Sequence, residues 1–152
     1  MKIIDILPEE RIISDLTAKN KKEVILELAN ALPQETLLTD KLIEVLLERE
    51  KLGSTGIGDG VAIPHGKTGE IDYLIASFGR SLQGLDFDSL DGKPTHLFFL
   101  LVAPENSAGI HLKALARISR LFKDAQFRSA LMRAKDHTDI FRIIKEEEVK
   151  YE

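Results

Sequence analysis

Hydrophobic positions follow two different spacings along the chain, and their order predicts strands interleaved with helices. In some segments apolar residues recur every three or four positions, as on the buried stripe of an amphipathic helix. In others they form short runs of strand length. The predicted helices span residues 20–32, 39–52, 110–123, 125–134 and 138–147, and the predicted strands span residues 11–16, 61–63, 72–81 and 95–103. Strands lying between helices predict an α/β fold with three layers, α/β/α, around a sheet of four to five strands.

Capping residues set the ends of the predicted helices. Asn20 stands at an N-cap position with Glu23 three residues later, which is close to a capping box. Gly53 follows the second helix and supplies its stop signal. Ser107 and Gly109 are both suitable caps for the third helix. These signals place the helix ends within a few residues.

The segment THLFFLLVA, residues 95–103, is an almost unbroken apolar run, which is typical of a strand buried on both faces. We therefore expect it at the centre of the sheet. A turn signal, Asp91-Gly92, precedes it, so a loop or hairpin joins it to the strand before. His96 at its start is expected to be a satisfied structural residue. The carboxylates of the turn are expected to face solvent: Asp86, Asp88 and Asp91.

Four glycines lie close together between the second helix and the second strand: Gly53, Gly56, Gly58 and Gly60. This density predicts backbone with positive φ or a close approach to another group. After the short strand, Pro64 lacks an N–H and is expected to end the ladder, which presents His65 where the strand gives out. A neutral imidazole there can attack phosphorus, accept a proton or bind a metal ion. The alternative is that His65 only hydrogen-bonds loop carbonyls.

Two more residues with polar side chains fall on the core-facing stripes of their helices. Arg49 follows Leu42 and Leu46 at helical spacing, so its guanidinium is expected on the inward side, where it needs a partner. The alternative is an arginine that snorkels from the helix end. His111 lies in the first turn of its helix, where the dipole favours an anion and a neutral imidazole. We expect it to donate to a phosphate oxygen; a core histidine bonded to the backbone is the alternative.

Composition narrows the class of protein. The chain has 152 residues, of which 43% are hydrophobic and 30% charged, and this predicts one soluble globular domain over residues 1–152. A net charge of -4 argues against nucleic-acid binding. No apolar run is long enough to span a bilayer and no signal peptide is evident, so we expect a cytoplasmic protein without direct membrane insertion. The absence of cysteine leaves covalent chemistry to histidine, serine, threonine or carboxylates.

Common motifs for other chemistries are missing. The glycine loop matches neither G-x-x-x-x-G-K-[ST] nor G-x-G-x-x-G between a strand and a helix, which disfavours a nucleotide site. G-x-S-x-G and H-E-x-x-H are absent, and a metal-dependent hydrolase built on the two histidines has no identifiable third ligand. A nucleophilic His65, an inward Arg49 and a second histidine, His111, are the parts of a phosphoryl-transfer site. The loop would add main-chain N–H groups, and its predicted phosphate-loop residues are Ser54, Thr55, Gly56 and Gly58.

The stretch STGIGDGVAIPHG, residues 54–66, preceded by Arg49-Glu50, resembles the active-site signature of the type-2 IIA domains of the bacterial phosphoenolpyruvate-dependent phosphotransferase system (PTS). This class includes the fructose/mannitol and the nitrogen-regulatory (PtsN-like) IIA proteins. The segment GLDFDSLDGKPTHLFFLLVAP, residues 84–104, and the pair His111-Leu112 resemble later parts of the same family, so the similarity covers nearly the whole chain.

The resemblance implies a mixed sheet between helical layers and a phosphohistidine at His65. It implies that the donor is the phosphohistidine of the small carrier HPr or of its nitrogen-branch counterpart, and that transport systems pass the phosphate to a cysteine of a IIB domain. Arg49 and His111 match supporting positions that stabilise the phosphoryl group. No cofactor, metal ion or nucleotide is implied in the transfer.

Cysteine content and length bear on the role that the resemblance implies. A cysteine-based IIB domain cannot lie in a chain without cysteine, so a free-standing IIA protein is expected, with a separate IIB protein or regulated proteins as partners. The run GSTGIG with IPHGK favours a nitrogen-regulatory switch over a sugar-transport component, which remains the alternative. Lys113, Arg117 and Arg120 form a basic stripe after His111, which is expected to be a solvated helix face or, alternatively, a docking surface for an acidic partner.

Overall fold

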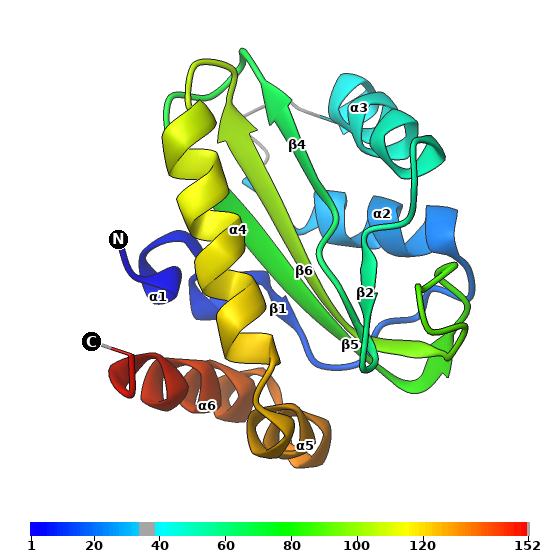
Figure 1. The fold of residues 1–152 in the computed structure, drawn as a ribbon, viewed down its shortest axis with the longest axis vertical. Helices are drawn as coiled ribbons and strands as arrows, with labels where there is room; N and C mark the ends of the chain where they lie inside the picture. The colour runs from blue at the N-terminus through cyan, green and yellow to red at the C-terminus, as the bar shows by residue number, and fades with distance from the viewer. Residues whose placement is uncertain (34–38, 152) are drawn as a thin grey trace.

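A mixed β-sheet runs through the middle of the molecule, and helices cover both of its faces (Figure 1). The structure is a computed structural model that describes residues 1–33 and 39–151. Its strands are β1 (Ile12–Ile13), β2 (Gly56–Gly58), β3 (Val61–Ala62), β4 (His65–Thr68), β5 (Ile75–Leu85) and β6 (Thr95–Pro104). Its helices are α1 (Ile3–Ile6), α2 (Lys21–Asn30), α3 (Thr39–Lys51), α4 (Ala108–Phe122), α5 (Ala125–Arg133) and α6 (His137–Val149), with a 3₁₀ turn at Glu9–Arg11.

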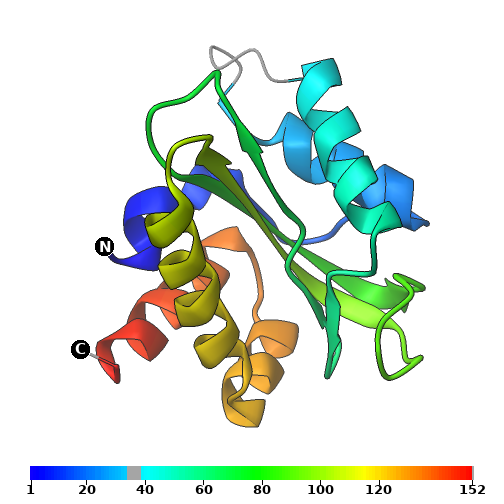
Figure 2. The same cartoon turned by 45° about the horizontal axis from the view of Figure 1, so that its top comes forward.

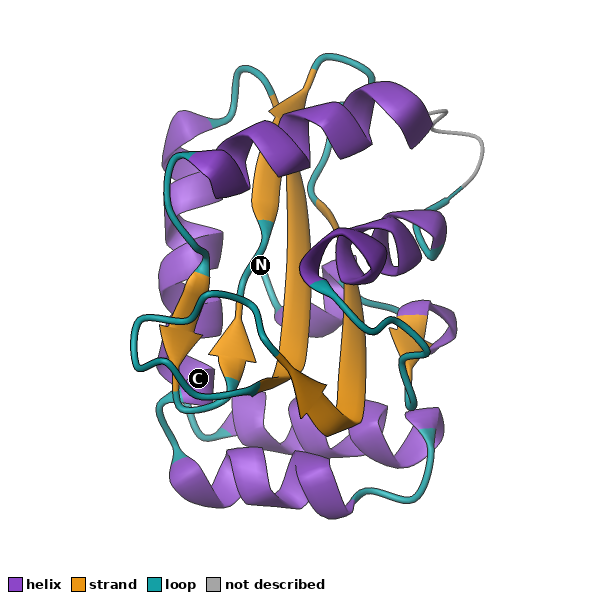
Figure 3. Cartoon of the chain, turned by 90° about the vertical axis from the view of Figure 1, so that its right-hand side faces the viewer, coloured by secondary structure: helices purple, strands orange, loops and turns teal. Residues whose placement is uncertain are grey.

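The three predicted layers are confirmed. Helices α2 and α3 lie on one face of the sheet, and α1, α4, α5 and α6 lie on the other, as the turned view shows (Figure 2). The view by secondary structure separates the same two helical layers on either side of the strands (Figure 3). Among the described residues, no helix is both long and apolar enough to cross a membrane.

The sheet is larger than the predicted four to five strands. Six strands are formed by the described residues, in the order β1-β5-β6-β3-β2, with β4 also paired to β6. The strands that the hydrophobic pattern missed are β2, a run of Gly56–Gly58, and β4, which begins at His65. β2 has a single apolar side chain, the exposed Ile57, and β4 has none, so neither shows the apolar pattern of a strand; pairing with neighbouring strands sets their place. The first strand is shorter than predicted and pairs with β5 over Ile12–Ile13 alone.

The prediction that the apolar run forms the central strand is confirmed. Strand β6 pairs with β5 on one side and with β3 and β4 on the other. Its side chains alternate between two separate cores: Leu97, Phe99 and Leu101 pack on the side of α4, and Phe98, Leu100 and Val102 on the side of α2 and α3. Successive side chains of β6 point to opposite faces of the sheet, and both faces are packed against apolar residues. This explains why the apolar run in the sequence is unbroken.

Helix ends agree with the capping signals at Asn20 and differ from them at the start of α4. The Asn20 side chain accepts the N–H of Glu23 and caps α2, while the Glu23 carboxylate accepts the N–H of Lys19, one residue earlier than in a capping box. Helix α4 begins at Ala108, before the predicted Ile110. Ser107 is its N-cap residue by position, but its hydroxyl donates to the carbonyl of Pro104 instead of accepting from the helix.

Candidate functional site

His65 lies at the first residue of β4, on the edge of the sheet. The prediction that Pro64 ends the ladder is wrong, because β3 and β4 pair with β6 in one continuous register, Ala62 with Phe98 and His65 with Leu101. Pro64 interrupts the strand without shifting it, and its carbonyl accepts the N–H of Leu101 at 3.0 Å. The pairing on both sides of the proline fixes the backbone of His65, which a strand end would leave free.

The imidazole of His65 is oriented by one main-chain bond. Its Nδ1 lies 2.9 Å from the carbonyl oxygen of Ile63. A carbonyl only accepts, so Nδ1 carries the proton in the neutral ring and the lone pair lies on Nε2. Burial lowers the pKa of His65, the Ile63 carbonyl opposes this, and the positive charge of Arg49 lowers the pKa further. The side chain is partly exposed, so a neutral, nucleophilic nitrogen can meet a reactant.

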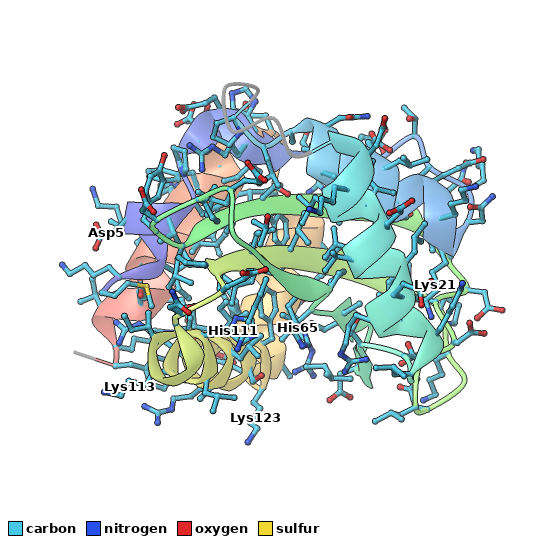
Figure 4. The ribbon with its side chains drawn as sticks, turned by 90° about the horizontal axis from the view of Figure 1, so that it is seen from above. Asp5, Lys21, His65, His111, Lys113 and Lys123 are labelled. Atoms are coloured by element: carbon cyan, nitrogen blue, oxygen red, sulfur yellow. The ribbon has the colours of Figure 1, made fainter. Side chains whose placement is uncertain are left out.

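His111 from α4 lies beside His65. The two ring centroids are 5.4 Å apart with the planes tilted by 53°, and the view from above shows the labelled rings adjacent (Figure 4). His111 is 6% exposed, and among the described residues its Nδ1 has no hydrogen-bond partner. Burial, His65 and Lys67 lower the pKa of His111. A buried nitrogen without a partner is costly in a finished core, but it suits a group that bonds a ligand.

Arg49 lies between the two predicted positions, a guanidinium that faces the core and one that extends from the helix end into solvent. Its guanidinium is partly buried at the end of α3 and donates from Nη1 to the carbonyl of Gly53 at 2.8 Å. This bond holds the side chain at the start of the glycine loop, two residues after the end of α3. Its positive charge lowers the pKa of His65, so Arg49 acts electrostatically on the imidazole.

The predicted phosphate-loop residues form the edge hairpin β2–β3. Asp59 and Gly60 at its tip have φ of 56° and 78°, the positive values that a two-residue type I′ turn requires. Several loop donors are already engaged: the Ser54 hydroxyl bonds the Phe87 carbonyl at 2.6 Å, and the Gly56 N–H bonds the Ser54 hydroxyl at 3.0 Å. Hydrogen bonds to other segments therefore fix the position of the loop.

The turn before β6 makes further hydrogen bonds to the β2–β3 hairpin. Asp91 accepts the N–H of Asp59 at 3.1 Å, and the N–H of Leu90 bonds the Gly56 carbonyl at 3.3 Å. Hydrogen bonds from the main-chain N–H groups of Lys93 and Asp59 lower the pKa of Asp91. Although its side chain is exposed as expected, Asp91 also holds the hairpin, a role that the Asp-Gly turn signal did not reveal.

Glu50 is the buried charge of α3 that sequence reasoning missed. Its side chain is 5% exposed and contacts Lys21 and Thr55. The available signal was the helical spacing, because Leu42, Leu46 and Glu50 are each four residues apart on one stripe. Arg49 lies one position to the side of that stripe, which explains why it is only partly buried.

Comparison with known proteins assigns the chain to a family. The family model described as "Phosphoenolpyruvate-dependent sugar phosphotransferase system, EIIA 2" matches residues 5–147. The chain belongs to this family. The resemblance drawn from residues 54–66 is thereby confirmed.

Relatives within the family come from two branches. A nitrogen regulatory protein of Bradyrhizobium diazoefficiens is 41% identical over 145 residues, covering 95% of each chain. The fructose-specific EIIABC component of Bacillus subtilis is 40% identical over 146 residues, covering 95% of this chain but 23% of that longer protein. The crystal structure of the nitrogen regulatory protein IIA-Ntr from Neisseria meningitidis superposes with a TM-score of 0.88 at 37% identity, over 93% of this chain and 98% of that one. The chain is thus a phosphotransferase-system IIA protein that is similar to both nitrogen-regulatory and fructose-specific relatives.

The other histidines of this IIA chain lie away from the pair. His96 is partly buried, with Nδ1 2.9 Å from the Ser81 carbonyl, which is the structural role expected of it. His137 is exposed at the start of α6, and its Nε2 lies 3.3 Å from Glu9. Among the described residues, no group of three or more His, Cys, Asp or Glu side chains has the arrangement of a metal site.

The basic stripe of α4 is divided among different contacts. Arg117 donates to the buried carboxylate of Glu148 at 2.7 Å, and the guanidinium of Arg120 lies 5.9 Å from the ring centroid of Tyr151. Lys113 is exposed and points away from the two histidines in the view from above (Figure 4). The three cations therefore do not form one free surface.

Proposed function

We propose that His65 is the phosphorylated residue of this IIA protein and that Nε2 is the accepting atom. The donor in this proposal is the phosphohistidine of HPr or of its nitrogen-branch counterpart. The observation that carries it is the bond from His65 Nδ1 to the Ile63 carbonyl, because it keeps the proton off Nε2 while the site remains partly open. The lowered pKa of His65 supports the same state, since it keeps the ring unprotonated at neutral pH.

The proposed step exchanges one phosphorus–nitrogen bond for another. The lone pair of His65 Nε2 attacks the phosphorus while the bond from phosphorus to the donor imidazole breaks, and that imidazole keeps the bonding pair. His65 Nδ1 retains its proton, and the Ile63 carbonyl stabilises the positive charge that the ring gains. The phosphate of the product is held on a ring that cannot rotate without losing this bond.

Arg49 and His111 are proposed to stabilise the phosphoryl oxygens from two sides. A group in transfer spreads its negative charge over three equatorial oxygens, which need donors already in position. Arg49 is a fixed cation with further N–H groups beyond the one bonded to Gly53. Over residues 1–33 and 39–151 the Nδ1 of His111 has no hydrogen-bond partner, so when it carries the proton of a neutral ring it can donate to a phosphoryl oxygen.

The phosphate-loop role of Ser54, Thr55, Gly56 and Gly58 stays a prediction. Because Thr55 N–H and Gly56 N–H have acceptors within the protein, we propose that the loop acts mainly by placing Arg49 and His65. Residues 1–152 would act as one domain, in the cytoplasm, where phosphoenolpyruvate is available.

The test is phosphorylation in a reconstituted chain of carriers. Wild-type protein incubated with phosphoenolpyruvate, Enzyme I and HPr should take up one acid-labile phosphate, and His65→Ala should take up none. His137→Ala is the matched control, because His137 is exposed and lies away from the pair. Uptake by His65→Ala equal to wild type, or no uptake by wild type from either HPr or its nitrogen-branch counterpart, would refute the proposal.

The receiver of the phosphate distinguishes two roles. We propose a regulatory switch whose partners change with phosphorylation, and the nitrogen regulatory relative supports it. The fructose-specific relative, almost as similar, favours transfer to the cysteine of a separate IIB domain as the second candidate. Phosphorylated protein should be mixed with isolated fructose-type and mannitol-type IIB domains. Fast loss of phosphate to either would support the transport role, whereas phosphate retention with partners that depend on phosphorylation would support the switch.

A further inference from the structure

Glu50 lies beneath the glycine loop, and its carboxylate is buried against Thr55. One oxygen accepts the main-chain N–H of Thr55 at 3.1 Å, and the other accepts the Thr55 hydroxyl. The Glu50 side chain is 5% exposed, so these bonds act where water does not compete with them. The last turn of α3 is thereby bonded to the loop through both the main-chain N–H and the hydroxyl of Thr55.

Lys21 neutralises this buried carboxylate and ties it to the turn before β6. Its ammonium lies 3.0 Å from Glu50 Oε1 and 3.5 Å from the carboxylate of Asp88. It also lies 4.8 Å from the ring centroid of Phe87, whose carbonyl accepts the Ser54 hydroxyl. In the view from above, Lys21 lies at the far end of the molecule from Lys113 (Figure 4). The carboxylate therefore joins α2, α3, the loop and the turn before β6.

Thr55 connects Glu50 to the reactive histidine. The Thr55 carbonyl accepts the N–H of Ile63 at 3.0 Å, and the Ile63 carbonyl bonds Nδ1 of His65 at 2.9 Å. A second branch runs along α3, where Arg49 bonds the carbonyl of Gly53, two residues before Thr55. A displacement of Thr55 is therefore passed both to the carbonyl that orients His65 and to the arginine that faces it.

We infer that Glu50 is a positioning residue for phosphoryl transfer. Through Thr55 it fixes the position of the His65 ring relative to Arg49. This inference rests on the proposed function of His65. Glu50 does not touch the reacting atoms: its oxygens are occupied by Thr55 and Lys21, on the core side of the loop. Its role is to keep the Ile63 carbonyl in place while the phosphoryl group arrives and leaves.

The experiment compares Glu50→Gln with Glu48→Gln. The first keeps the length of the side chain but replaces one acceptor oxygen by an amide and removes the charge opposite Lys21. Glu48 lies two residues earlier on the same helix, is exposed and pairs with exposed Lys51 at 3.0 Å, so its variant controls for the loss of one negative charge. Thr55→Val is a second test variant, because it removes the hydroxyl bond to Glu50 and leaves the charge in place.

The first readout is the steady-state rate of transfer from phosphorylated HPr. Glu50→Gln should lower kcat by about tenfold and change KM for the donor by less than about twofold, since the substituted side chain is buried beneath the loop while the reacting ring is misplaced. Glu48→Gln should match wild type. If Glu50→Gln does not fold, Thr55→Val replaces it, with a smaller fall in kcat of about threefold expected. Wild-type kcat in a folded Glu50 or Thr55 variant would overturn the inference.

The second readout does not need phosphate. ¹⁵N NMR of the His65 ring at neutral pH should show the Nδ1–H tautomer in wild type and a larger share of the Nε2–H tautomer in Glu50→Gln. An unchanged tautomer share together with a lower melting temperature would assign Glu50 a purely structural role and refute the inference. Failure of wild type to accept phosphate would instead refute the role of His65, and the NMR comparison would still decide whether Glu50 orients the ring.

Discussion

Two buried polar groups on the same face of the sheet differ in whether the fold satisfies their hydrogen bonds. On β5, Arg80 is 3% exposed and donates from Nε to the Ser14 carbonyl at 2.8 Å. Its Nη1 bonds the carbonyls of Leu131 at 2.9 Å and Ala134 at 2.6 Å, at the carboxyl end of α5. On α4, His111 is 6% exposed, yet its Nδ1 has no partner among the described residues. Arg80 is satisfied by the fold, and His111 is not.

This difference separates structural from functional polar burial. Arg80 joins the segment before α2 to the end of α5 and favours the carbonyl-rich end of a helix, as a cation should. Nothing in that arrangement is left to bind. The histidine pair, which lies near a cation, keeps a nitrogen without a hydrogen bond. Such a group costs stability, and proteins retain it where a ligand completes the bond.

The largest expected effect is on stability and comes from Arg80→Met. The substitution leaves several buried carbonyls without donors and should lower the free energy of unfolding by about 3–5 kcal/mol. Urea denaturation measures it, and the rate of phosphorylation of the folded fraction should stay near wild type. Arg142→Met, which removes only exposed ion pairs, is the control and should change stability far less. A stable Arg80→Met protein would break the comparison.

The second effect is on the rate of transfer and not on stability, and it comes from His111→Gln. Removing a preorganised donor beside the phosphoryl group should slow transfer about 100-fold, equivalent to about 2.7 kcal/mol of barrier. Stability should change little, because within the part of the chain that the structure describes the Nδ1 of His111 has no partner to lose. Quenched-flow phosphorylation and urea denaturation of the same samples provide the two numbers. A large loss of stability with unchanged transfer would make His111 a core residue like Arg80.

Arg49→Lys should give a smaller loss of transfer. Lysine keeps the charge but cannot bond the Gly53 carbonyl and a phosphoryl oxygen with a rigid fork, so the rate should fall about tenfold. Lys51→Arg, at an exposed position on the same helix end, is the matched control. Equal rates for Arg49→Lys and wild type would show that only the charge at this position matters.

The smallest effect is a dependence of stability on pH. Burial lowers the pKa of both His65 and His111 from the ordinary value of 6.5, so the unfolded chain binds these protons more tightly than the folded protein. Their contribution to stability is complete above pH 6.5 and is lost as pH falls below it toward the lowered pKa values. Burial raises the pKa of Glu147, which acts in the opposite direction, so the measured quantity is the difference between wild type and His111→Gln.

That difference is read from urea denaturation between about pH 7.5 and about pH 5.5. Wild type should lose more stability over this range than His111→Gln, which lacks one of the two titrating rings. Parallel profiles would mean that His111 is as accessible to protons in the folded protein as in the unfolded chain.

The sequence by itself determined the layers, the central strand and the place of most helices. Periodic apolar residues and caps such as Asn20 act locally, and the run over residues 95–103 is apolar because both of its faces are covered. It also determined which residue types could perform the chemistry, since His65 after Pro64 and a glycine-rich loop form a motif long enough to identify the family.

Only the tertiary structure decided how these groups meet. Strands β2 and β4 exist because β3 and β6 offer them partners, which no local hydrophobic pattern records. Helical spacing could show that Glu50 is buried, but its ion pair with Lys21 depends on how another helix packs against α3. Likewise, the distance of 5.4 Å between the rings of His65 and His111 depends on how α4 packs against the sheet, a long-range fact. Local sequence fixes what each segment can form, whereas packing between distant segments fixes which polar groups are satisfied and which stay open.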